Sequence, residues 1–146
     1  MCLARPDSRN PARPVAFVPV NRFGAIAVGG LLGSLARFGI AVIVGPGSPG
    51  ALPTATLTVN LVGAVAIGVV AASAWVSTGP AWRRPFVITG VLGGFTTFSA
   101  LAMETGLLLD SGHQVVAAAY VVITMVFGLL AVRLGMLLAR RLRWSR

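Results

Sequence analysis

Four long apolar segments, separated by short polar or glycine- and proline-rich stretches, dominate this sequence. They cover residues 23–44, 54–76, 86–109 and 115–138. Each holds about the 20 apolar residues that a helix needs to cross the hydrocarbon core of a bilayer. The pattern therefore predicts an all-α membrane protein, in which four transmembrane helices form one domain over residues 23–139.

The two ends of the chain have a different character. Residues 1–22 carry recurring prolines and arginines without a helical period, which predicts a disordered basic tail. A secretory signal is the alternative, but the apolar run that follows is too long for its hydrophobic region and no convincing cleavage site is visible. Residues 140–146 form a basic C-terminus, and the single cysteine, Cys2, allows no internal disulfide.

Composition supports the membrane assignment. Hydrophobic residues make up 56% of the chain and charged residues only 10%, whereas a soluble domain has about 25% charged residues. The net charge of +9 comes from arginine, since the sequence has no lysine. Nucleic-acid-binding proteins gather such charge on a polar face with exposed aromatic residues. Here the arginines flank apolar runs, which excludes that class.

The distribution of arginine predicts how the chain is oriented. Four spans place both termini, and the connection around residues 77–85, on one side of the membrane. That side carries ten arginines and the other two connections carry none; the ten are Arg5, Arg9, Arg13, Arg22, Arg83, Arg84, Arg140, Arg141, Arg143 and Arg146. Because arginine-rich loops stay in the cytoplasm, both termini are predicted to be cytoplasmic in a multi-pass plasma-membrane protein.

The third span has an unusual centre, GVLGGFTTFSALAME, from Gly90 to Glu104. The glycine pair at 93 and 94 weakens a helix by about 1 kcal/mol per residue relative to alanine, and Thr96, Thr97 and Ser99 follow. We expect the third helix to break near its middle, between Gly93 and Thr96, and to free carbonyls that could coordinate a cation. A straight helix, with hydroxyls bonded to the preceding turn, is the alternative.

Other polar or aromatic residues within the spans allow two interpretations each. Arg37 either extends to the interface or forms an anion-attracting vestibule or a partner for Glu104. Asn60 either makes an interhelical hydrogen bond or donates to an anion in a pore. Phe98 either packs against neighbours or presents its electropositive ring edge to an anion.

Small residues recur within the first two spans at helical spacing. Gly29 with Gly33, and Gly30 with Ser34, predict close helix packing in a tight bundle that a second subunit completes. His113 lies in a predicted turn and is expected to be solvated. One histidine and one cysteine give no metal-ligand spacing, and no catalytic triad or phosphate loop is present, so we do not expect an enzyme.

Three segments carry a resemblance to a known family. GGLLGSLARF (29–38), TLTVNLVGAVAIG (56–68) and GVLGGFTTFSALAMET (90–105) resemble, in order and spacing, the signature segments of the Fluc/CrcB fluoride channels, over residues 24–138. The resemblance implies an antiparallel dimer of four-helix subunits with two anion pores. It also implies passive, fluoride-specific efflux that lowers cytoplasmic fluoride.

The same resemblance implies roles for individual residues. A structural, non-transported Na⁺ would be held by main-chain carbonyls at Gly93 and Thr96. Arg37 and Glu104 match the family's arginine and glutamate. The matching positions of the anion pore are Asn60, Phe98, Leu101, Tyr120 and Thr124. Leu101 departs from the family pattern, which has a second phenylalanine there, and leucine offers no ring edge to an anion.

The orientation bias is a second departure. Single-gene members of the family insert in both orientations, whereas this chain carries ten arginines on one side against none on the other. We therefore predict a heterodimer with a homologous subunit of opposite orientation. Two alternatives stay open: a non-conducting or partly conducting subunit of such a heterodimer, and a small multidrug transporter, although that mechanism typically needs a carboxylate in the first span, where this chain has Arg37.

Overall fold

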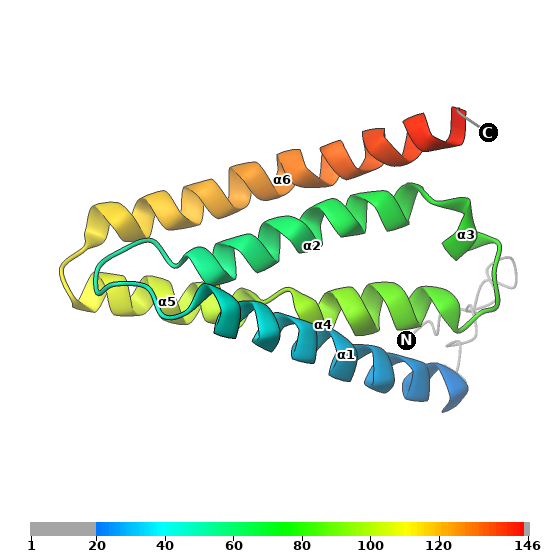
Figure 1. Cartoon of the computed structure of the whole chain (residues 1–146), viewed down its shortest axis with the longest axis horizontal. Coiled ribbons are helices and arrows are strands. Elements are labelled where there is room, and N and C mark those ends of the chain that lie inside the picture. Colours follow the sequence, from blue (N-terminus) through cyan, green and yellow to red (C-terminus); the bar gives the residue numbers. More distant parts are fainter. Residues whose placement is uncertain (1–19, 145–146) are drawn as a thin grey trace, which may run out of the picture.

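The computed structural model describes residues 20–144, and every regular element in this range is helical (Figure 1). The predicted tail therefore lies almost wholly outside the described residues. In chain order the elements are α1 (Val20–Val44), α2 (Thr54–Ala72), α3 (Ala74–Ser77), the π-helix η1 (Pro85–Leu92), α4 (Gly93–Phe95), α5 (Phe98–Asp110) and α6 (Gln114–Trp144).

Four helical stretches are long and apolar enough to cross a membrane, as the hydrophobic pattern predicted. They are Arg22–Val44, Thr54–Ala72, Pro85–Asp110 and Gln114–Arg141. The second is shorter than expected: the helix ends at Ala72, where Ser73 becomes extended and its side chain accepts from the Trp75 N–H to begin α3. The fourth helix is longer than expected, because α6 continues into the basic C-terminal segment.

The four spans form an up-and-down bundle with two distinct ends. The start of α1, the short helix α3 and the end of α6 lie at one end, and the connections after α1 and α5 lie at the other (Figure 1). The second end turns at Gly50 and Gly112, whose positive φ angles of 76° and 81° are unfavourable for residues with a Cβ. All basic residues of the α3–η1 connection therefore share an end with the basic end of α6.

Glycines let the spans approach in two pairs, α1 with η1–α4 and α2 with α6. A Cβ at Gly33 would overlap the Val91 carbonyl oxygen, and one at Gly68 would overlap that of Val132. In a membrane, where helices gain little from the hydrophobic effect, such backbone contact supplies the packing energy. The predicted role of the small residues in the first span, close helix approach, is confirmed at Gly33.

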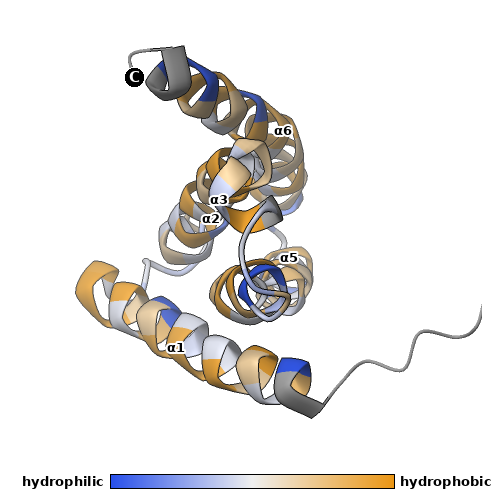
Figure 2. Cartoon of the chain, turned by 90° about the vertical axis from the view of Figure 1, so that its right-hand side faces the viewer, coloured by the Kyte–Doolittle hydropathy of each residue, from blue (hydrophilic) through white to orange (hydrophobic). Residues whose placement is uncertain are grey.

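Large apolar side chains cover much of the outside of this bundle. Hydrophobic residues are frequent along α1, α2 and α6 (Figure 2), and many large ones are exposed, such as Phe38 at 67%. The buried cluster is small and lies between α5 and α6, where Leu101, Leu108, Ala117 and Tyr120 pack together. A soluble protein would not leave such surfaces in water; in a bilayer they face lipid or a second subunit.

Candidate functional site

The third span is interrupted at Thr96 and Thr97. Thr96 has φ −79° and ψ 156°, and Thr97 has φ −148° and ψ 122°, so both residues are extended between α4 and α5. The Thr97 side chain then accepts from the Ala100 N–H at 3.2 Å and caps α5. Two β-branched residues with hydroxyls that compete for backbone groups favour this local departure from helix.

The break is confirmed, but its predicted position was partly wrong. Gly93 and Gly94 belong to the helical segment α4, and only Thr96 of the expected stretch is extended. Gly94 instead serves packing, because a Cβ there would overlap the backbone of Gly30 on α1, whereas a Cβ at Gly93 would make only an ordinary contact. The sequence also gave no sign that Pro85–Leu92, just before α4, forms a π-helix, a conformation that occurs often at functional sites.

Asn60 on α2 spans the break with its side-chain amide. Its Nδ2 donates to the Thr97 carbonyl oxygen at 3.0 Å, and its Oδ1 accepts from the Thr97 N–H at 2.9 Å. Both backbone groups of Thr97 are thereby satisfied, which a membrane-embedded chain requires. Of the two interpretations of Asn60, the interhelical hydrogen bond is present. The second N–H of its amide group remains a candidate donor to a ligand.

The pairing of Asn60 with Thr97 also affects a backbone carbonyl next to the break. In a continuous helix the Thr97 N–H would donate to the Gly93 carbonyl, four residues earlier. Here that N–H bonds to Asn60, so the Gly93 carbonyl is left without its regular helical donor. A main-chain carbonyl in this state is the type of ligand that a hard cation prefers. Among the described residues no group of three or more His, Cys, Asp or Glu side chains could hold a metal.

An open groove of about 330 Å³ runs along one side of the break between α2, α5 and α6. Four of the predicted pore positions line it: Asn60, Phe98, Leu101 and Thr124. Phe98 is 73% exposed, so its ring is not a core packing element within this subunit. Thr96 and Thr97, the two residues of the break, also line the groove, and its remaining walls are apolar.

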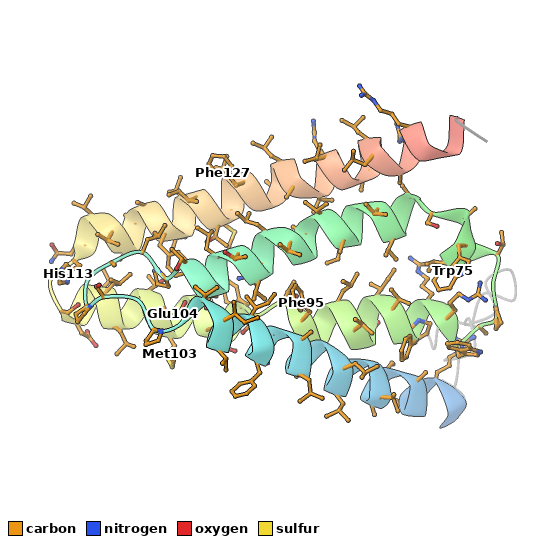
Figure 3. All side chains as sticks on the ribbon, in the orientation of Figure 1. Trp75, Phe95, Met103, Glu104, His113 and Phe127 are labelled. Atoms are coloured by element: carbon orange, nitrogen blue, oxygen red, sulfur yellow. The ribbon has the colours of Figure 1, made fainter. Side chains whose placement is uncertain are left out.

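Tyr120, expected along the same path, does not line this groove. Its side chain is completely buried, and its hydroxyl donates to Glu104 Oε2 at 2.6 Å. Thr56 on α2 donates to the other carboxylate oxygen, Oε1, at 2.8 Å. The labelled Glu104 lies on α5 in the half of the bundle toward the α5–α6 turn (Figure 3). Its carboxylate therefore ties together α2, α5 and α6.

Arg37 lies on the opposite side of the break. It lines a second groove of about 330 Å³ with Ser34, Thr56 and Thr97. Among the described residues it makes no ion pair with Glu104, whose two oxygens accept from Thr56 and Tyr120 instead. Of the alternatives for Arg37, a pair with Glu104 is therefore absent, while its position beside a groove that carries hydroxyls fits the vestibule interpretation.

Thr97 is the site residue that sequence reasoning overlooked. It lines both grooves, forms the break, caps α5 and bonds to Asn60. The signal was present as two adjacent threonines in the middle of an apolar run, but nothing in the pattern distinguished Thr97 from Thr96. By contrast, His113 lies exposed in the α5–α6 turn beside the Ser111 hydroxyl, as expected.

Comparisons with known proteins agree with this architecture. Residues 24–136 match the family described as "CrcB-like protein, Camphor Resistance (CrcB)". The chain is 42% identical over 122 residues to the fluoride-specific ion channel FluC of Paracoccus denitrificans, which covers 84% of this chain and 97% of that protein. It is 41% identical to FluC 1 of Mycobacterium bovis, over 86% and 96% of the two chains, and 43% identical to FluC of Sphingopyxis alaskensis, over 84% and 98%. Four apolar spans, a third span broken beside Asn60 and a match over nearly all of the described residues place this chain in the CrcB-like family of membrane proteins.

Proposed function

We propose that this protein is a subunit of a fluoride-specific ion channel through which F⁻ leaves the cytoplasm passively. The observation that carries the proposal is the groove at the helix break, in which Asn60, Phe98 and Thr124 lie together. Relatives at about 40% identity over most of the chain are named fluoride-specific ion channels. In acidic surroundings HF enters a cell and dissociates, and a channel lets F⁻ flow out down its electrochemical gradient.

Selectivity would follow from the way the groove replaces water around the ion. Fluoride is small and strongly hydrated, so a pore has to offer several donors in place of its hydration shell. The second N–H of the Asn60 amide and the ring edge of Phe98 are such donors, whereas the hydroxyls of Thr96 and Thr124 donate to backbone carbonyls in this structure. The remaining walls of the groove are apolar and offer no hydrogen bonds to a bulkier anion.

The break also fits a structural Na⁺. Gly93 and Thr96 would contribute main-chain carbonyls, and the Gly93 carbonyl has lost its helical donor to Asn60. Bound Na⁺ would supply positive charge that fixes the break and offsets the repulsion between anions. This chain itself supports the site, because Asn60 bonds to both backbone groups of Thr97 and holds the backbone extended next to these carbonyls.

A second subunit would complete the pores. Phe98 is 73% exposed and the groove beside it is open, so one chain alone does not enclose an ion. The arginine distribution predicts an orientation with both termini in the cytoplasm. We therefore favour an antiparallel heterodimer with a homologous chain that carries the opposite bias, and an orientation assay on the chain expressed alone tests this: a mixed population would exclude an obligatory heterodimer.

One specific observation favours a second candidate, a subunit with little conduction of its own. Leu101 occupies the place of the family's second pore phenylalanine and is only 3% exposed, packed in the small core. It presents no ring edge to the groove. A small multidrug transporter is disfavoured, because the carboxylate of Glu104 is held by two hydroxyls and the first span offers only Arg37.

A fluoride-electrode assay on liposomes separates these possibilities. Liposomes loaded with fluoride receive this chain alone, its homologous partner alone, or both. Rapid efflux that requires both chains supports the heterodimeric channel, and efflux from this chain alone supports a homodimer. No fluoride efflux in any arm, with correctly inserted protein, would reject the proposed function.

A further inference from the structure

A second polar feature lies far from the helix break, at the end of the bundle that carries α3. A pocket of about 530 Å³ is formed there by the start of α1, the α3–η1 connection and the first turns of η1. Arg22 and Arg84 line it together with Val76, Gly79, Ile88 and Thr89. The grooves at the break do not share any of these residues.

The charge in this pocket has no counterpart among the described residues. Its two charged lining residues are both arginines. The carboxylates that the structure describes are Glu104, which is held by Thr56 and Tyr120, and Asp110, which ends α5 at the opposite end of the bundle. The pocket therefore attracts an anion that the described part of the protein does not supply.

Arg22 carries the more specific signal. Its Nε is buried and has no hydrogen-bond partner. A buried donor without an acceptor is costly, and more so when the group is charged. The neighbouring Arg83 differs: although its Nε is also unpartnered, its guanidinium stacks over the Trp75 ring at 4.2 Å and donates to the Trp75 carbonyl at 3.0 Å. Trp75 marks this end of the bundle in Figure 3.

We propose that this pocket binds the phosphate group of an anionic membrane lipid, with Arg22 and Arg84 as its ligands. The apolar spans that begin at Arg22 and Pro85 place the pocket at headgroup depth, where lipid phosphates lie. The planar guanidinium fork matches phosphate oxygens in pairs, and Val76 and Ile88 offer apolar walls to the lipid's glycerol and first methylenes. Basic pockets between membrane helices are a known setting for such headgroups.

Lipid retention by the purified full-length protein tests the site. Native mass spectrometry of the protein in mild detergent is compared after addition of phosphatidylglycerol, phosphatidylcholine or inorganic phosphate. Arg22→Gln/Arg84→Gln removes the two ligands, and Arg140→Gln/Arg141→Gln removes the same charge from α6 at the same end. One basic residue near an anionic headgroup contributes about fivefold, so we expect the pocket variant to bind phosphatidylglycerol roughly 20-fold more weakly. The control should change little in moderate salt, which screens diffuse attraction.

Each other outcome overturns the proposal in a defined way. Equal weakening in both double variants would mean diffuse charge rather than a site. If the unaltered protein retained phosphatidylcholine as well as phosphatidylglycerol, the bound lipid would be ordinary surrounding lipid and not a specific ligand of the pocket. Displacement of phosphatidylglycerol by inorganic phosphate would assign the pocket to a soluble anion. Because loss of Arg22 could disturb the start of α1, the single change Arg84→Gln at an exposed residue serves as a second test, with about fivefold weaker binding expected.

Discussion

The side-chain amide of Asn60 pairs with both the carbonyl and the N–H of Thr97, 37 residues later, at 3.0 Å and 2.9 Å. This pairing takes the place of the helical hydrogen bond of the Thr97 N–H, at the point where the third span is extended. It therefore links the stability of the break to the same residue that offers a donor to the groove. The predictions below separate these two contributions.

Asn60→Val should destabilise the protein, because Thr97 loses both partners within the membrane. Leaving a buried backbone group unsatisfied costs about 1–3 kcal/mol, and we expect a loss of about that size in the free energy of unfolding. Thr58→Val, which removes a polar side chain from an exposed position of the same helix, should have little effect. Denaturation in detergent measures both, and equal stability of the two variants would show that the pairing does not hold the break.

Phe98→Ile should abolish fluoride efflux while leaving the fold intact. The ring is largely exposed in the groove, so its removal creates no cavity in the core of the subunit, but it does remove the electropositive ring edge. Phe127→Ile is the matched control, because Phe127 is also exposed but lies on α6. Efflux is measured with a fluoride electrode, in the presence of the partner subunit if the channel requires it; unchanged efflux from the Phe98 variant would assign the ring to packing.

Tyr120→Phe and Thr56→Val should each destabilise the bundle by about 1.5–3 kcal/mol, because each removes a hydrogen bond to a charged carboxylate. The double variant leaves Glu104 without these donors and should lose more than either single variant. Thr124→Val is the control, since its hydroxyl bonds back to the Tyr120 carbonyl of its own helix. Equal unfolding curves for all three single variants would contradict the role of Glu104 in tying α2, α5 and α6 together.

Gly33→Ala should separate α1 from η1, because the new Cβ would overlap the Val91 carbonyl oxygen. Overpacking of this kind typically costs about 1–3 kcal/mol. Gly39→Ala on the same helix meets nothing within 4 Å and should be neutral or stabilising by up to about 1 kcal/mol. The thermal midpoint in detergent should therefore fall for Gly33→Ala and stay unchanged or rise for Gly39→Ala, and a rise in both variants would mean that helix propensity, not close approach, governs this interface.

Replacing Na⁺ with a bulky organic cation should lower the thermal midpoint of the assembled protein if the break holds Na⁺. A ligand at 100 times its dissociation constant stabilises the folded state by about 2.7 kcal/mol, which sets the scale of the loss. In Asn60→Val the extended backbone at Thr97 loses the side chain that supports it, so the same exchange should have little effect there. An equal response of the two proteins would place any Na⁺ effect elsewhere.

Much of the fold could be predicted from local patterns in the sequence. Four apolar runs of membrane length, separated by glycine, proline and charged residues, predicted four spanning helices because the bilayer demands about 20 apolar residues for each. The glycine and threonine content of the third span predicted a break, since these residues weaken helices individually. Asn60 stood out as an amide within an apolar span, whereas the pore role of Phe98 was implied by the resemblance to the fluoride channels.

Only the tertiary structure decided which of these residues act together. The break falls at Thr96 and Thr97 rather than at Gly93, because the helical Gly94 contacts Gly30 of α1, while Asn60 on α2 bonds to Thr97. Glu104 accepts from Tyr120 and Thr56 rather than pairing with Arg37. These choices depend on how helices are placed against one another. A hydrophobic pattern reports how strongly each segment prefers lipid, but not which polar groups meet once the helices pack.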